Sequence, residues 1–211
     1  LLVDGVVGPK TWKLLCQPAL PLQSDRFEFS KYEKIADESA RGRDARKVLL
    51  YAVQDIGKRE APSGSNQGKE ISHLVEGYNE HWKINSESYP PWCAIAVSSW
   101  MRLGLGLSTW DQIPFGNWFG AVAQITAWAK KRKQFFKADQ IEIKGGDIVT
   151  LPRGGSSSDV SSSGRAGHTG LVLKNEGDRL LTIEGNVSNK VKVCSRPLKM
   201  LSGIVVWSDD E

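Results

Sequence analysis

The sequence predicts an α+β fold in which helices come first and an antiparallel β-sheet follows. Apolar residues recur at helical spacing in stretches between residues 45 and 129, and beyond Gln140 the apolar period becomes that of strands. Helices followed by a run of strands favour N-terminal helices packed on an antiparallel β-sheet. The length of 211 residues leaves room for one full domain and a fragment, since a domain usually has roughly 100–200 residues.

Three main helices are expected. The apolar face of the first runs from Ala45 to Ile56, and Gly57 ends it. The second follows Pro90-Pro91, which hold the chain extended, so that Cys93 lies in its first turn. The third has its apolar stripe between residues 121 and 129.

Five strands are expected after Gln140, and clusters of Gly, Asn, Asp and Ser separate them. They are Asp147–Leu151, His168–Leu173, Leu180–Glu184, Val191–Cys194 and Ile204–Trp207. The segment Gly154–Gly164 holds six Ser and three Gly in eleven residues, a composition typical of a surface loop.

Composition indicates a globular protein. We expect it neither to bind nucleic acid nor to span a membrane. The apolar content is 40% and the charged content 25%, which suffice for a core. The net charge of +4 is small, and the run 130–133 is interpreted as a solvated helix end, with attraction to an anionic surface as the weaker alternative. No apolar stretch approaches the roughly 20 residues of a membrane span. Of three cysteines, Cys16, Cys93 and Cys194, at least one must stay unpaired within the chain.

The N-terminal region divides into two pieces before the main domain, which we place at 44–211. The chain opens with Leu1-Leu2-Val3 and without Met, so we expect it to be part of a longer protein. The run Asp4-Gly5-Val6-Val7-Gly8-Pro9-Lys10-Thr11-Trp12 resembles the closing segment of the bacterial peptidoglycan-binding domain, which makes 1–17 a C-terminal remnant of such a domain. Residues 18–43 are rich in Pro, Ser and mixed charge, and we interpret them as a linker with a short helix near 29–39.

The chemistry centres on Cys93, because a thiol at a helix start beside an imidazole is activated as a nucleophile. His73, His81 and His168 compete as the base. A hairpin turning at residues 175–178 pairs positions whose numbers sum to about 353. This register puts His168 beside Glu184 or Gly185 and brings an imidazole, a carboxylate and, at Asn186, a carboxamide together.

Several motifs then resemble the CHAP family of cysteine, histidine-dependent amidohydrolases/peptidases over roughly 44–207. The resemblance implies a papain-like fold, cleavage of an amide in bacterial peptidoglycan, and a location in the cell wall, the periplasm or outside the cell. It implies Cys93 as nucleophile, His168 as general base and acid, Glu184 as orienting acid and Asn186 as an auxiliary polar group, with no metal or cofactor. The motifs are Trp92-Cys93-Ala94, Gly145-Gly146-Asp147-Ile148-Val149, Gly167-His168-Thr169-Gly170-Leu171-Val172, Ile183-Glu184-Gly185-Asn186 and, before the cysteine, Ile56-Gly57, Glu60 and Ser65-Asn66.

The substrate site is expected around Trp92, Asn66 and Trp118. Trp118 belongs to an aromatic stretch that lines a groove or else fills the core, and the sequence favours neither. The oxyanion donors stay open, since no Gln precedes Cys93; its own N–H with a group from Tyr78, Tyr89 or Trp92 is one possibility. Members of the family differ in the amide they cut.

We expect the chain to be monomeric. Two alternative functions remain. One is a cell-wall-binding module without catalysis. The other is a metal-dependent hydrolase with zinc held by residues among His73, His81, Cys93 and His168, although their spacings fit no tight pair. Calcium is not expected, because the segment 85–88 lacks the clustered carboxylates that such a site prefers.

Overall fold

A computed structural model of the chain describes residues 23–84, 89–152 and 167–208. The predicted remnant at 1–17, the segment 85–88 considered for calcium, and the Ser-rich segment 154–164 lie outside the described residues.

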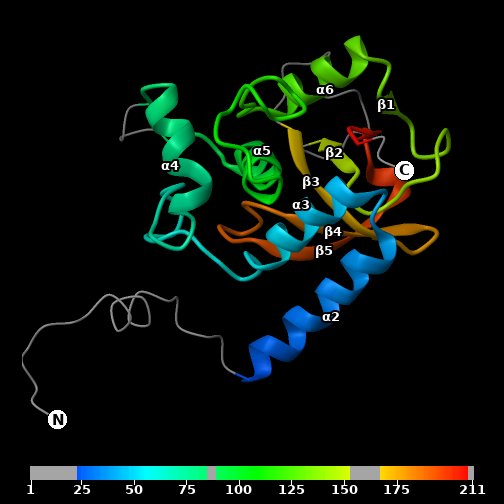
Figure 1. Cartoon of the computed structure of the whole chain (residues 1–211), viewed down its shortest axis with the longest axis horizontal. Helices are drawn as coiled ribbons and strands as arrows, with labels where there is room; N and C mark the ends of the chain where they lie inside the picture. Colours follow the sequence, from blue (N-terminus) through cyan, green and yellow to red (C-terminus); the bar gives the residue numbers. More distant parts are fainter. Residues whose placement is uncertain (1–22, 85–88, 153–166, 209–211) are drawn as a thin grey trace, which may run out of the picture.

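Helices precede strands, and the expectation of a mixed α+β fold with an antiparallel sheet is confirmed (Figure 1). The helices are α2 (Gln23–Ser39), α3 (Arg43–Val53), α4 (Ser72–His81), α5 (Cys93–Gly104) and α6 (Val122–Lys131). The strands are β1 (Phe135–Phe136), β2 (Ile148–Pro152), β3 (Gly167–Asn175), β4 (Arg179–Glu184), β5 (Lys192–Pro197) and β6 (Gly203–Val205), with a 3-10 turn at Leu198–Met200.

The six strands form one sheet in the order β1-β6-β2-β3-β4-β5, with every neighbouring pair antiparallel. β3 lies in the interior of the sheet, between β2 and β4. The β3–β4 register pairs Leu171 with Ile183, so paired numbers sum to 354, and an irregularity between Val172 and Lys174 changes the sum nearer the turn. At the end of the hairpin where His168 lies, the sum therefore exceeds the predicted 353 by one, and the extra residue in β3 brings it down to this value from 355 near the turn.

α5 is the central helix of the molecule and packs against α3, α4 and β3. Every residue from Cys93 to Met101 is buried, which explains why this helix is apolar on nearly all sides. The start of α5 is consequently held by packing and presents its first turn to the sheet.

α2 is longer than the short helix predicted inside the proposed linker, and it packs on α3 and β3. Ala36 is buried, and Phe29, Tyr32 and Ile35 lie partly buried against the core. Charged residues on the outward side of α2 dilute its apolar signal, which is why composition alone indicated a linker here.

The junction between α2 and α3 is fastened to the sheet at the Gly145-Gly146-Asp147 segment. Arg41 donates two hydrogen bonds to the Asp147 carboxylate, each 2.7 Å long. Gly146 has φ +89, and a Cβ built on it would lie 2.5 Å from Ala45 Cβ, so this backbone position requires glycine.

Two elements were not predicted, the short strand β1 and the helix α4. α4 contains Gly77, which is a poor helix former. A Cβ on Gly77 would lie 2.9 Å from the Trp118 ring, so the glycine admits that indole against the helix.

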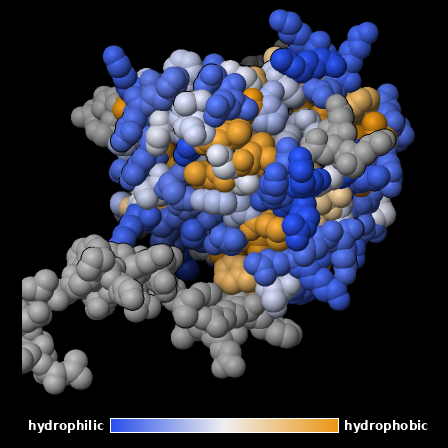
Figure 2. Space-filling model, in the orientation of Figure 1, coloured by the Kyte–Doolittle hydropathy of each residue, from blue (hydrophilic) through white to orange (hydrophobic). Residues whose placement is uncertain are grey.

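In the described part of the chain, every helix is too short or too polar to cross a bilayer. On the face seen in Figure 2, hydrophobic residues gather near the middle and hydrophilic residues surround them.

Candidate active site

Cys93 is the first residue of α5 and is 4% exposed. The segment Tyr89-Pro90-Pro91, which has no regular secondary structure, leads into the helix. The partial positive charge at a helix start favours the thiolate form of a cysteine placed there.

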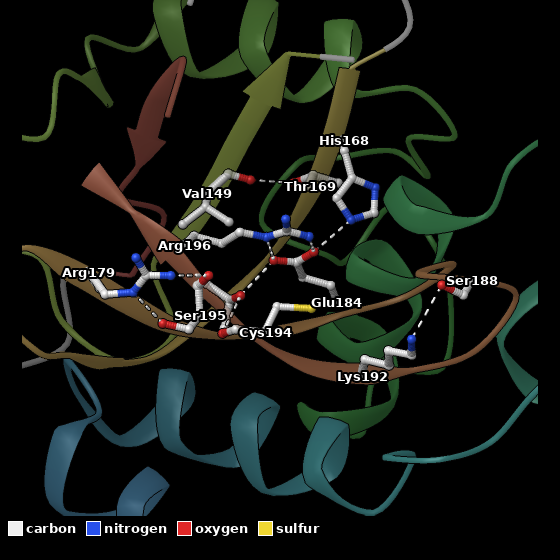
Figure 3. A network of polar contacts seen from close by, with 11 residues as sticks. Val149, His168, Thr169, Arg179, Glu184, Ser188, Lys192, Cys194, Ser195 and Arg196 are labelled. Atoms are coloured by element: carbon white, nitrogen blue, oxygen red, sulfur yellow. Dashed lines mark hydrogen bonds and ion pairs between the residues drawn. The ribbon is translucent and has the colours of Figure 1, made fainter. Parts of the chain in front are cut away.

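His168, the second residue of β3, is 8% exposed, and its Nε2 lies 2.8 Å from Glu184 Oε2 (Figure 3). Continuing the observed register sets Asn186 opposite His168, with Glu184 two residues away on the same face of the sheet. The hairpin thus brings His168 and Glu184 together, as its sequence predicts, although through a diagonal rather than a directly opposed pair.

Two glycines on this hairpin allow the close packing. A Cβ on Gly170 would lie 2.5 Å from Glu184 Cγ, so the missing side chain makes room for the carboxylate. A Cβ on Gly185 would lie 2.8 Å from Ala96 Cβ and 2.9 Å from the Trp92 ring. Gly185 therefore lets the first turn of α5, with Cys93, approach the end of β4.

The pKa of His168 is raised from 6.5 to about 9. Burial alone would lower this pKa, but hydrogen bonding and charge interactions with Cys93 and Glu184 outweigh it. The imidazole therefore interacts with both the Cys93 thiol and the Glu184 carboxylate, and its charged form is favoured.

Glu184 is fully buried and is held as a carboxylate. Burial raises its pKa, but hydrogen bonds from Arg196, His168 and Thr182 lower it to about 2. Arg196 donates from Nε to Oε1 (2.8 Å) and from Nη2 to Oε2 (2.5 Å), and Thr182 donates to Oε1 (2.6 Å).

Sequence reasoning missed Arg196 and Thr182. Both lie on the same face of the β4–β5 pair as Glu184, since Leu180 pairs with Arg196 and Thr182 with Cys194. Strand alternation within β4 puts Thr182 on the face of Glu184, whereas Arg196 would have been found only if the β5 register had been known.

Cys194 does not share the surroundings of Cys93. It lies on β5, and burial, followed by the charge of Glu184, raises the pKa of its thiol to about 11. This thiol stays protonated near neutral pH, so Cys93 is the stronger candidate nucleophile of the two cysteines that the structure describes.

Asn186 and Asn66 meet beside the site. Asn186 has φ +61 and donates from Nδ2 to Asn66 Oδ1 (3.3 Å), while Asn66 donates to the carbonyl of Tyr89 (2.8 Å). These two amides tie the end of β4 to the segment that leads into Cys93. The side-chain amide of Asn186 is thus engaged by Asn66.

The two tryptophans expected to bind substrate are both enclosed. Trp92 is 0% exposed and donates its indole N–H to Glu60 (2.6 Å), and Trp118 is 1% exposed. Trp118 packs edge-on against Tyr78. In this conformation both indoles are core residues, and the Trp92 N–H is already committed to Glu60 rather than facing an oxyanion.

The other two histidines have separate surroundings. His73 Nε2 lies 3.0 Å from both oxygens of the buried Asp55, and His81 packs edge-on against Trp82 at the end of α4. Within residues 23–84, 89–152 and 167–208, His, Cys, Asp and Glu nowhere gather in a group of three or more suited to a metal ion.

A hollow of about 300 Å³ opens beside His168 and gives the imidazole an accessible edge, and Cys93 is not among the residues that line it. His168, Asn186 and Arg196 contribute polar groups to its wall, and Leu151 and Met200 contribute apolar ones. A bound peptide group at this point would therefore reach the imidazole directly.

Comparisons with known proteins give no match: no family model fits the chain, and no curated protein or solved structure is detectably similar to it.

Proposed function

We propose that this protein is a cysteine hydrolase that cleaves an amide bond through a Cys93 thioester. The contact of His168 with Cys93, at the start of α5, on one side and with Glu184 on the other carries the proposal. It joins a nucleophile, a base and an orienting acid in the order that acyl transfer requires.

With Nε2 held by Glu184, Nδ1 is the ring nitrogen left to exchange a proton with Cys93. The thiolate attacks the amide carbonyl carbon, and His168 gives its proton to the leaving nitrogen as the C–N bond breaks. A water molecule then loses a proton to His168 and attacks the thioester, which releases the carboxylic acid and restores the thiol. The sum is hydrolysis of one amide.

We propose peptidoglycan as the substrate and a papain-like arrangement as the fold. Both rest on the resemblance of the motifs around Cys93, His168 and Glu184 to the CHAP family and on the N-terminal run like that of a peptidoglycan-binding domain. The helix-start cysteine and the hairpin histidine support this arrangement.

The direct test compares Cys93→Ala with Cys194→Ala on purified cell walls. Removing the thiol of Cys93 should lower amine release from peptidoglycan by at least about 1,000-fold, because no thioester can form. Cys194→Ala should stay within about twofold of the parent, since its thiol is protonated and is not the proposed nucleophile. Wall lysis by Cys93→Ala at the parent rate would reject the proposal.

The same assay separates the two alternatives. A binding module would sediment with insoluble peptidoglycan and release no amines. A metal-dependent hydrolase would lose activity to EDTA and keep it in iodoacetamide, whereas the thiol mechanism requires the reverse.

A further inference from the structure

The hollow beside His168 has a positively charged wall that the proposed reaction does not use. Besides His168, the end of β2, residues 186–188 after β4, Arg196 and Met200 line it. Among the described residues that line it, none carries a carboxylate. Glu184, which balances the charge of Arg196, is fully buried behind the wall. The charge that faces the hollow is therefore positive.

The Arg196 guanidinium has donors beyond those that Glu184 takes. A guanidinium carries five N–H groups, and the contacts with Glu184 engage Nε and Nη2. The third nitrogen, Nη1, is directed away from the carboxylate (Figure 3). Within the described part of the chain, Nη1 makes no hydrogen bond to a nitrogen or an oxygen and is not a buried unsatisfied atom, so the exposed 30% of the side chain includes it. A ligand in the hollow can accept from it.

The rest of the wall suits the same kind of ligand. Lys192 Nζ donates to Ser188 Oγ (3.3 Å), and Ser188 lines the hollow (Figure 3). Because this hydroxyl accepts from Lys192, its own hydrogen is available to a ligand. Leu151 and Met200 supply apolar surface, which reduces screening by water and strengthens a charge interaction there. The hollow thus offers donors and positive charge, and the matching group in a peptide is a carboxylate.

The proposed mechanism brings the substrate to this hollow. His168 gives its proton to the leaving nitrogen, so that nitrogen must lie against the imidazole. The hollow is lined by His168 and not by Cys93, so it lies on the side of the leaving nitrogen rather than on the side of the attacked carbonyl. The part of the substrate that departs as the amine therefore extends into the hollow.

We propose that this hollow binds a carboxylate of the substrate and that Arg196 selects for it. Nη1 donates to the ligand while Nε and Nη2 stay on Glu184, and the Ser188 hydroxyl adds a second donor. The inference rests on the proposed function, and it narrows the substrate to amides whose amine portion carries a carboxylate.

The test is a calorimetric titration of the full chain carrying Cys93→Ala, which lacks the proposed nucleophile. The probe is a lysine-type muramyl tetrapeptide, and its partner is the same peptide with its carboxylates converted to carboxamides. The peptide with free carboxylates should bind roughly ten times more tightly, because hydrogen bonds between ionised groups are about twice as strong as neutral ones. Equal binding of the two peptides would overturn the proposal.

Arg196→Gln in the Cys93→Ala chain should bind both peptides with nearly the same affinity, since glutamine carries no charge. Its matched control is Arg179→Gln, which removes a guanidinium that bonds to Ser195 and does not line the hollow, and it should keep the preference. Comparing two peptides on one variant cancels any general effect of the lost Glu184 contact. An equal effect of the two glutamine variants on the preference would also overturn the proposal.

A second measurement needs no change at Arg196. In the Cys93→Ala chain, the side-chain N–H signals of Arg196 in an NMR spectrum should shift when the peptide with free carboxylates is added and should stay in place with the amidated peptide. Signals that move with neither peptide would contradict the proposal, whether or not Arg196→Gln folds.

These outcomes are independent of turnover. If Cys93→Ala lysed walls normally, the proposed function would fail while the titration still reported on the hollow. If Cys93→Ala lost lysis but the two peptides bound equally, the carboxylate subsite alone would fail.

Discussion

Arg196 ends a row of alternating charges that begins at the Cys93 thiol. When the thiol proton is on His168, the row runs from thiolate to imidazolium, then to the Glu184 carboxylate and the Arg196 guanidinium. Each charge has an opposite neighbour, which is how a buried carboxylate is tolerated. Arg196 thereby fixes Glu184, and Glu184 fixes the ring of His168.

Replacing Arg196 with Gln should destabilise the protein by about 2 kcal/mol, because Glu184 loses two charge-assisted hydrogen bonds and stays buried. Part of the loss is screened, since the Arg196 side chain is 30% exposed. Urea unfolding measures the change. The control is Arg179→Gln on the neighbouring strand, where the half-buried arginine hydrogen-bonds to Ser195 and not to a buried carboxylate, and it should cost less than about 1 kcal/mol. Equal losses in the two variants would contradict the role given to Arg196.

Among the residues of the candidate site, the sequence predicted the contact between the two that lie on a single hairpin. His168 and Glu184 are joined by a short turn, so strand alternation suffices to place them on one face. Arg196 belongs to the next strand, whose register depends on a longer connection, and its contact with Glu184 was not foreseeable. The burial of Trp92 was also missed, because its partner Glu60 lies 32 positions away in the chain.

Among the elements, the contact between α5 and β4 decides whether the thiol meets the imidazole. Gly185 lies against Trp92 and Ala96, so the spacing between helix and strand leaves no room for a side chain there. The helix start and the strand end were each predicted, but their contact depends on this packing, which no periodicity in the sequence reveals.

Gly185→Ala should separate α5 from β4 and destabilise the protein by about 2 kcal/mol, as overpacking of a dense core does. Amine release from cell walls should fall at least about tenfold, because Cys93 moves relative to His168. Gly106→Ala serves as the control: it follows α5, has φ +68 and has nothing within 4 Å of an added Cβ. It should cost about 1 kcal/mol through backbone strain and leave activity intact. Full activity in Gly185→Ala would show that the contact is not needed.

For the whole molecule, the ionised groups buried beside Cys93 should make stability depend on pH. Glu184 has a folded pKa of about 2 against a usual 4.5, so its contribution is present above about pH 4.5 and is lost as pH falls toward 2. His168 has a folded pKa of about 9 against 6.5, so its contribution is present below about pH 6.5 and is lost as pH rises through 9.

For these two groups, resistance to urea should therefore be greatest between about pH 4.5 and 6.5 and should fall on both sides. Urea midpoints measured at about pH 3, 5.5 and 9.5 test this. In Cys93→Ala the decline on the alkaline side should shrink, since the thiol no longer raises the pKa of His168. A midpoint that stays constant from about pH 5.5 to 9.5 in the parent would contradict the charge assignment.

The order of helices and strands was predictable because the local spacing of apolar residues indicates each element, as in the apolar face of α3 and the alternation of β4. The extent of α2 was not, because its burial comes from contacts with α3 and β3 rather than from its own composition. The same holds for α4, whose Gly77 weakens the helical signal and is explained only by the indole of Trp118 packed against it.

The central claim is that the thiol at the start of α5 and the imidazole of β3 interact directly. An NMR titration of the His168 ring in the parent chain and in Cys93→Ala tests it most directly. The parent should show a pKa of about 9, and the variant a clearly lower one, because hydrogen bonding and charge from Cys93 are removed. The same pKa in both proteins, or a value near 6.5 in the parent, would contradict the account.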